Sequence, residues 1–218
     1  YKHDAMAFGS GIVDVERGKF AAAKPYHWQT DTAIARNSWC YTTDLDYKSS
    51  NEILCYLVDV VSKNGNLLLN VGPKADGSFA TEDLSILEDI GNWLSTNGEA
   101  IYRSRPWRYA AEGPTQEVEG QFSDSSATEY IGSDFRFTAG NGCIYATCLR
   151  YPGDGQIRIK SLAKSKDPNK PAFHGIITDV EILGFEEKPE FRIDESGLQF
   201  TTKTVQSTFP VVIKIHTD

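Results

Sequence analysis

The carboxylate with the clearest chemical potential follows a short apolar run near the start of the chain. Glu16 comes directly after the β-prone run Gly11–Val15 and precedes Arg17. Parallel strands of α/β barrels carry catalytic groups at their carboxyl ends, and cleavage of a glycosidic bond needs a carboxylic acid that protonates the leaving oxygen. Glu16 is therefore a candidate general acid. The alternative is a solvated ion pair with Arg17, the common role of such neighbours.

Asp14 lies two residues before Glu16 and would share its face of a strand. Like charges this close influence each other's protonation, so the pair could serve proton transfer. It could equally be an exposed pair at a strand end. The sequence leaves both interpretations open.

Two tryptophans, Trp28 and Trp39, lie in segments typical of loops or strand ends. A flat aromatic ring matches the apolar C–H face of a sugar, so both are candidates to bind a neutral carbohydrate. The alternative for each is packing in the core. Asn70 could bond sugar hydroxyls, but a role in holding its own loop is favoured.

Metal and cofactor sites are not indicated. The histidines show no metal-ligand spacing, and no Gly-rich phosphate loop or G-x-S-x-G elbow occurs. The cysteines lack C-x2-C spacing, and two of them would point to opposite faces of one strand, so four buried free thiols are expected. The histidines are His3, His27, His174 and His216. The cysteines are Cys40, Cys55, Cys143 and Cys148.

The composition excludes several classes of partner. The 218 residues carry a net charge of −8, whereas a nucleic-acid partner needs a basic footprint. No apolar run reaches the roughly 18 residues that a bilayer crossing needs, so no membrane partner is expected. A hydrophobic fraction of 40% supports a packed core. The chain starts at Tyr1, within sequence typical of a folded region, so a natural N-terminus with any targeting signal could lie upstream.

The composition changes near residue 105. Before it, strand-like and helix-like segments alternate, which indicates parallel strands. The expected elements are strands at 11–15, 33–41 and 66–71, a helix capped by Ser49 with Glu52, and a helix at 81–96. Three strands cannot close a barrel of eight. Residues 1–104 are therefore either a small open α/β unit or the tail of a barrel.

Residues 105–218 show short alternating runs separated by Gly, Pro, Asp and Asn turns, as in Val180–Leu183 and Val212–Ile215. This pattern predicts an antiparallel β-sandwich. The expected strands are 134–138, 143–150, 156–162, 176–183, 198–202 and 211–216.

The stretch Lys63–Gly77 closely resembles the signature of the α-L-fucosidases of glycoside hydrolase family 29. The resemblance covers essentially the whole chain. The further segments that are similar to the family in order and spacing are Asp14–Gly18, Trp28–Asp31, Ser38–Tyr41, Trp93–Tyr102, Arg105–Trp107, Glu112–Thr115 and Val180–Gly184. The family more often has Gly where Cys40 stands.

The resemblance implies the C-terminal part of an irregular (β/α)8 barrel at 1–104 and a β-sandwich at 105–218. It implies a retaining exo-glycosidase that removes terminal α-linked L-fucose from a fucosylated oligosaccharide or glycoconjugate, with no metal or cofactor. Glu16 matches the acid/base segment, Trp39 matches an aromatic of the fucose pocket, and Trp28 is a plausible neighbour of the site.

One family feature is missing from these residues. The family nucleophile is an Asp in a Trp-x-Asp type of motif on an earlier strand, and the histidines that hold fucose also come from earlier strands. Trp28 and Asp31 have a different spacing, so Asp31 is not assigned as nucleophile. We therefore expect a missing N-terminal barrel half as partner, and no activity from the isolated chain.

Two other functions stay open. One is a non-catalytic glycan-binding sandwich with a vestigial α/β segment, and the other is a catalytically dead relative that acts in assembly. Aromatic side chains exposed on one sandwich face would favour the binding module. Phe135, Phe137, Tyr145 and Phe200 fall instead on alternating, core-like positions.

Overall fold

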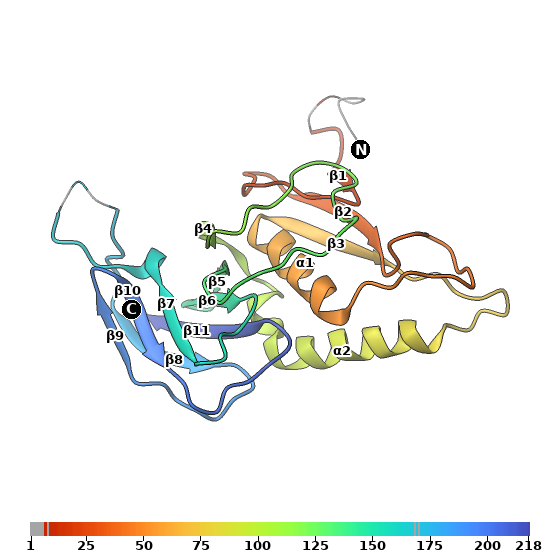
Figure 1. The fold of residues 1–218 in the computed structure, drawn as a ribbon. Coiled ribbons are helices and arrows are strands. Elements are labelled where there is room, and N and C mark those ends of the chain that lie inside the picture. The colour runs from red at the N-terminus through yellow and green to blue at the C-terminus, as the bar shows by residue number, and fades with distance from the viewer. Residues whose placement is uncertain (1–6, 8, 168, 170) are drawn as a thin grey trace. The chain divides into compact units, whose positions relative to one another are not determined.

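A computed structural model describes residues 7, 9–167, 169 and 171–218, so His3 lies outside the described residues. The chain forms two compact units (Figure 1). The first runs up to Ser95 and includes Gln116–Thr128, and the second comprises Thr96–Thr115 and Glu129–Asp218. The chain therefore returns to the first unit after it has entered the second.

The first unit is built on a parallel sheet of β1 (Val13–Glu16), β2 (Trp28–Ala33) and β3 (Gly65–Asn70), in the order β1-β2-β3. The parallel arrangement and two of the three expected strands are confirmed. The strand expected at 33–41 was wrong, because the residues that pair with both neighbours are those of β2. The β-branched threonines of β2 fill its buried face, whereas 34–49 is mostly loop.

Two helices follow the expected pattern. In α1 (Ser50–Ser62), the N-cap Ser49 accepts a hydrogen bond from the backbone N–H of Glu52, at 3.2 Å. The longer α2 spans Thr81–Asn97 and is followed by the 3₁₀ helix η2 (Gly98–Ala100). Among the helices of the described residues, none combines the length and apolarity needed to cross a membrane.

One face of the parallel sheet is covered by α1. Val15 of β1, Trp28 of β2 and Val60 of α1 form one buried cluster. Gly65 of β3 faces the same cluster, and a Cβ atom there would lie 2.6 Å from the Trp28 ring and 2.8 Å from Val60. Only glycine lets the helix and the indole approach β3 this closely.

The second unit contains two antiparallel sheets, β4-β5-β6-β11-β8 and β7-β10-β9. The strands are β4 (Arg105–Glu112), β5 (Phe135–Gly140), β6 (Cys143–Cys148), β7 (Gln156–Ile159), β8 (Ile177–Ile182), β9 (Phe191–Asp194), β10 (Gly197–Thr201) and β11 (Val211–Thr217). Side chains from both sheets, including Phe137, Ile213 and Phe200, share one buried core. All six expected strands are present.

Sequence patterns missed β4 and β9. Neither strand has a fully buried residue: β9 alternates between half-buried and exposed positions, whereas β4 mixes the two without strict alternation, and Pro106 lies within β4. The expected strand at 156–162 ends at Ile159, where the 3₁₀ helix η3 (Lys160–Leu162) begins.

The chain first passes from one compact unit to the other at 95/96. Thr138 donates to the carbonyl of Ala100 at 2.7 Å, and Glu99 accepts from Tyr145 at 2.9 Å and from Lys214 at 2.8 Å. Burial by itself would raise the pKa of Glu99, but the bonds from Lys214 and Tyr145 lower it below its ordinary value. These contacts join η2 to β5, β6 and β11 within the second unit.

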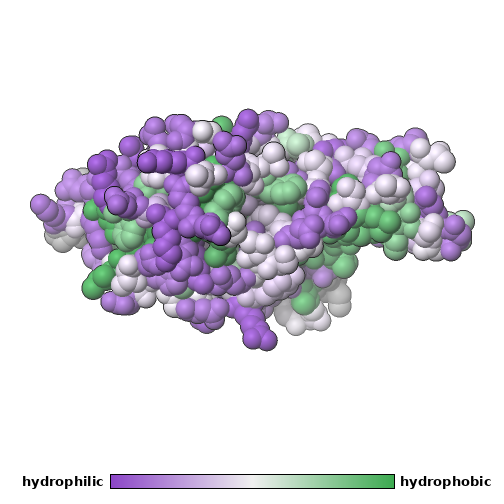
Figure 2. Space-filling view, turned by 90° about the horizontal axis from the view of Figure 1, so that it is seen from below, coloured by the Kyte–Doolittle hydropathy of each residue, from purple (hydrophilic) through white to green (hydrophobic). Residues whose placement is uncertain are grey.

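The surface in Figure 2 is mainly hydrophilic, with hydrophobic residues exposed between the polar ones. Large apolar side chains that reach solvent include Leu68 of β3, 55% exposed, and Leu84 of α2, 54% exposed. Single exposed apolar residues are ordinary. Leu68 is unusual, because parallel sheets normally have both faces covered.

We predict opposite effects of alanine at two glycines of the first unit. Gly65→Ala should destabilise the protein by about 1–3 kcal/mol, because the new methyl group collides with Trp28 and Val60. Gly91→Ala, on the exposed side of α2, meets nothing within 4 Å and should stabilise by about 0.5–1 kcal/mol. Urea unfolding of both variants measures the difference, and equal midpoints would contradict the packing described here.

Candidate functional site

Glu16 is the last residue of β1, at the carboxyl end of the parallel sheet. The register places it beside Asp31 of β2, and places Asp14 beside Gln29, whose side-chain amide donates to Asp14 at 3.4 Å. All four side chains lie on the sheet face opposite α1 and are half-buried. Three carboxyl groups therefore share one face near the strand ends.

The two residues after Glu16 have separate structural roles. Arg17 adopts a left-handed backbone conformation, with φ 47°, while its N–H still bonds the carbonyl of Asp31 at 2.8 Å. Gly18 follows, and a Cβ atom there would lie 1.8 Å from the carbonyl oxygen of Gly120. The sequence Glu-Arg-Gly thus ends the strand, turns the chain and admits the returning segment 116–128.

The buried guanidinium of Arg17 organises the loop after β2. It donates to the carbonyl oxygens of Ala35 at 3.3 Å, Arg36 at 3.1 Å and Ser38 at 3.4 Å. The guanidinium carbon also lies 4.3 Å from the centre of the Trp39 ring, a cation–π contact. The residue next to Glu16 therefore positions the candidate sugar-binding aromatic.

Asp124, from the returning segment, balances the charges beneath this loop. Its carboxylate lies 3.7 Å from Arg17 and 3.0 Å from Lys48, and it accepts from Thr32 at 2.5 Å. The three charged side chains are at most 9% exposed. Burial lowers the pKa of Lys48, and the neighbouring Asp124 opposes that shift.

Trp39 is also held through its backbone. The side-chain amide of Asn70, at the end of β3, donates to the Trp39 carbonyl at 2.6 Å. Gly72 allows a close approach to the same loop, because a Cβ atom there would lie 2.6 Å from the Tyr41 nitrogen. Asn70 has the structural role expected for it, but it holds the loop after β2 rather than its own. The Trp39 ring is left half-buried.

Trp28 has a different environment. Its side chain is 0% exposed, its indole N–H donates to the carbonyl of Lys63 at 2.9 Å, and Phe20 packs edge-on at 4.9 Å. A fully buried ring on the helix-facing side of the sheet presents no surface to a sugar. Trp28 packs as a core residue.

Sequence reasoning did not single out two residues of this arrangement. The spacing of Asp31 to Trp28 does not match the family's nucleophile motif, yet the parallel register places Asp31 next to Glu16. Asp124 is 92 residues from Thr32, the residue it bonds. No local sequence pattern marks a partner this far away in the chain. The position of Asp124 in the polar run 123–126 is only a weak signal of a functional or structural role.

Two expectations on other side chains can be compared with the structure. The aromatics Phe135, Phe137, Tyr145 and Phe200 are at most 6% exposed, which confirms their core positions and weakens the binding-module alternative. All four cysteines are free thiols as expected, but Cys40 is exposed rather than buried.

Comparisons with known proteins give one consistent result. Residues 2–99 match the family model described as Alpha-L-fucosidase. Tissue alpha-L-fucosidase of Bos taurus is 43% identical over 175 residues, which cover 79% of this chain and 31% of that protein. Tissue alpha-L-fucosidase of Rattus norvegicus is 33% identical over 191 residues, which cover 85% of this chain and 36% of that protein. The chain thus spans about a third of the length of these relatives.

Solved structures agree on the fold. The crystal structure of Thermotoga maritima alpha-fucosidase in complex with fucose superposes with a TM-score of 0.70 and 24% identity, and covers 94% of this chain and 42% of that chain. At 24% identity, this likeness concerns the fold. The family match over residues 2–99 and these relatives, which are named alpha-L-fucosidases, agree with the resemblance that the sequence indicated.

We predict that Asp124→Asn destabilises the protein by about 3–5 kcal/mol, because Arg17 and Lys48 would stay buried without a carboxylate. Glu129→Gln is the matched control: it removes one partner of an exposed ion pair with Arg150 and should cost at most about 1 kcal/mol. Urea unfolding compares the two variants. Similar small losses in both would contradict the role given to Asp124.

Proposed function

We propose that the protein containing this chain is a retaining exo-glycosidase that hydrolyses terminal α-L-fucosyl linkages of fucosylated glycans, with Glu16 as general acid/base. The observation that carries the proposal is the position of Glu16: it ends a parallel strand, and the residue after it lies over Trp39. An acid and an apolar ring at the mouth of such a sheet fit a sugar ring and its glycosidic oxygen.

The chemistry follows from two carboxyl groups. A nucleophilic carboxylate, from outside these 218 residues, attacks the anomeric carbon while protonated Glu16 donates its proton to the leaving oxygen. Glu16 then accepts a proton from water, whose oxygen displaces the enzyme carboxylate and regenerates the sugar with its original configuration. In retaining enzymes the two carboxyl groups lie about 5–5.5 Å apart. Asp31 and Asp14 share the sheet face of Glu16.

The uncovered face of the parallel sheet supports the longer enzyme. The carboxylates and the exposed Leu68 lie on the face opposite α1, and the register aligns Leu68 with Asp31 and Glu16. Because parallel sheets are normally covered on both faces, we propose that further strands continue this sheet into a (β/α)8 barrel. They would supply the nucleophile and cover Leu68, and the second unit would form the β-sandwich.

The stacked Trp39 suggests how a small sugar is held. Arg17 covers one region of the ring and its bonds to the loop carbonyls fix the ring in place. The half-buried remainder offers an apolar surface suited to the methyl group and C–H face of a deoxy sugar. No metal or organic cofactor takes part in this mechanism.

Glu16→Gln tests the assignment in the full-length enzyme. The glutamine keeps the shape of the side chain and removes the transferable proton, so kcat/KM on an α-L-fucoside with a poor leaving group should fall by about 10²–10⁴-fold. The loss should be smaller on a nitrophenyl α-L-fucoside, whose leaving group needs less protonation.

Asp14→Asn serves as the comparison, because Asp14 lies on the same face two residues earlier. We expect a smaller loss with no dependence on the leaving group. If Asp14→Asn carried the leaving-group effect and Glu16→Gln did not, the acid would be Asp14. Thermal unfolding of both variants confirms that they are folded.

The isolated 218-residue chain should show no turnover of a nitrophenyl α-L-fucoside. It contains no Trp-x-Asp type of motif, and the edges of an open sheet should also favour aggregation. The full-length enzyme at equal concentration is the positive control. Turnover by the purified chain alone would show that its own carboxylates suffice.

A further inference from the structure

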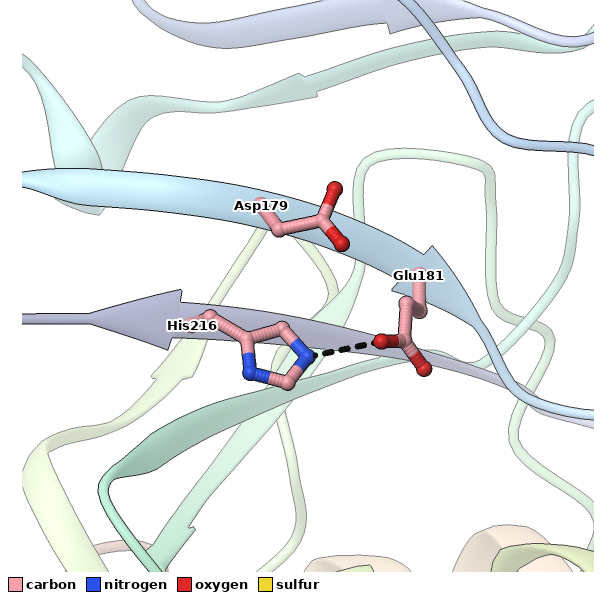
Figure 3. A group of neighbouring side chains, drawn as sticks. All are labelled: Asp179, Glu181 and His216. Atoms are coloured by element: carbon pink, nitrogen blue, oxygen red, sulfur yellow. Dashed lines mark hydrogen bonds and ion pairs between the residues drawn. The ribbon is translucent and has the colours of Figure 1, made fainter.

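Three potential metal ligands lie together on the five-stranded sheet of the second unit. Asp179 and Glu181 are on β8, and His216 is on the neighbouring β11 (Figure 3). The antiparallel register pairs His216 with Asp179, and Glu181 shares their face because it lies two residues further along β8. Val180 and Ile215, on the other face, are buried in the core.

The ligand atoms of these three residues are close enough to share one ion. One carboxylate oxygen of each acid and one ring nitrogen of the histidine all lie within 4.8 Å of one another. Nε2 of His216 is 2.9 Å from Oε1 of Glu181. Both strands belong to one sheet with a packed core beneath it, so the ligands sit on rigid elements.

The other nitrogen of His216 has a partner that favours metal binding. Nδ1 lies 3.6 Å from the sulfur of Cys143, which stands opposite His216 on β6. The thiol donates to the carbonyl of Asn141 at 3.7 Å, so its sulfur can accept from Nδ1–H. In the tautomer with the proton on Nδ1, Nε2 carries a lone pair directed at the Glu181 carboxylate. Two lone pairs facing each other repel unless a cation or a proton lies between them.

We propose that Asp179, Glu181 and His216 bind a divalent transition-metal ion of the Zn²⁺ type. One imidazole and two carboxylates are a donor set that zinc accepts, with water in the remaining position. An imidazole ligand disfavours Ca²⁺ and Mg²⁺, which prefer oxygen. The ion would join β8 to the C-terminal strand β11 and stabilise the second unit, because it binds the folded form.

Two lysines near the three ligands could compete with a metal ion for the carboxylates. Lys214 faces the same side but is held by Glu99 at 2.8 and 3.1 Å. Lys188 lies 3.6 Å from Asp179, and its side chain is 73% exposed. An incoming ion would displace Lys188 readily, because an exposed ion pair of this kind contributes little. Sequence spacing gave no indication of this site, since its ligands come from two strands far apart in the chain.

The test is a Zn²⁺ titration by calorimetry on protein with the complete sequence, in a Cys40→Ser background because the exposed Cys40 thiol could bind zinc by itself. We expect one saturable Zn²⁺ per chain and much weaker binding of Ca²⁺. His216→Ala and Glu181→Gln should each weaken Zn²⁺ binding by about tenfold or more. Zn²⁺ should raise the melting temperature of the parent protein and not that of His216→Ala.

Two variants separate this site from unspecific binding. His174→Ala removes an exposed histidine in a loop of the same unit and should leave the affinity unchanged. Lys188→Gln should tighten binding several-fold, because it removes the competing cation. The proposal is overturned if the parent protein shows no saturable Zn²⁺ binding, or if His216→Ala, folded by its melting curve, binds Zn²⁺ as tightly as the parent.

Discussion

The guanidinium of Arg17 is the group on which the rest of the first unit's candidate site depends. A buried cation is costly unless it is paired and hydrogen-bonded, and here it bonds three loop carbonyls and faces Asp124. These bonds define the path of the loop after β2, and the ring of Trp39 rests on the same guanidinium. Because Arg17 follows Glu16 directly, one side chain links the acid to the aromatic.

The returning segment 116–128 explains why this cation can be buried. The segment pairs with the chain after β1, where the N–H of Phe122 bonds the carbonyl of Glu16 at 2.9 Å and that of Asp124 bonds the carbonyl of Arg17 at 3.1 Å. Gly18 permits the approach, since any Cβ there would collide with the segment. A stretch that follows β4 in the chain is therefore part of the unit that holds Glu16.

The two faces of the parallel sheet have different roles. The face toward α1 is apolar and packs against the helix. Trp28 lies on this face and is therefore buried in the core rather than available to a sugar. The opposite face carries Asp14, Glu16 and Asp31 together with the exposed Leu68. Polar side chains on one face and packing on the other agree with the site proposed for the face opposite α1.

Sequence alone determined the local elements and the resemblance to a family. The Ser49 cap, the periodicity of α1 and α2, the apolar run of β3 and the alternation in β8 and β11 are short-range signals, and each marks a real element. Tertiary structure decided what depends on strand register and on long-range contact. It alone placed Asp31 beside Glu16, brought Asp124 to Arg17, and buried Trp28, because pairing across strands and the return of a distant segment leave no periodic trace in the sequence.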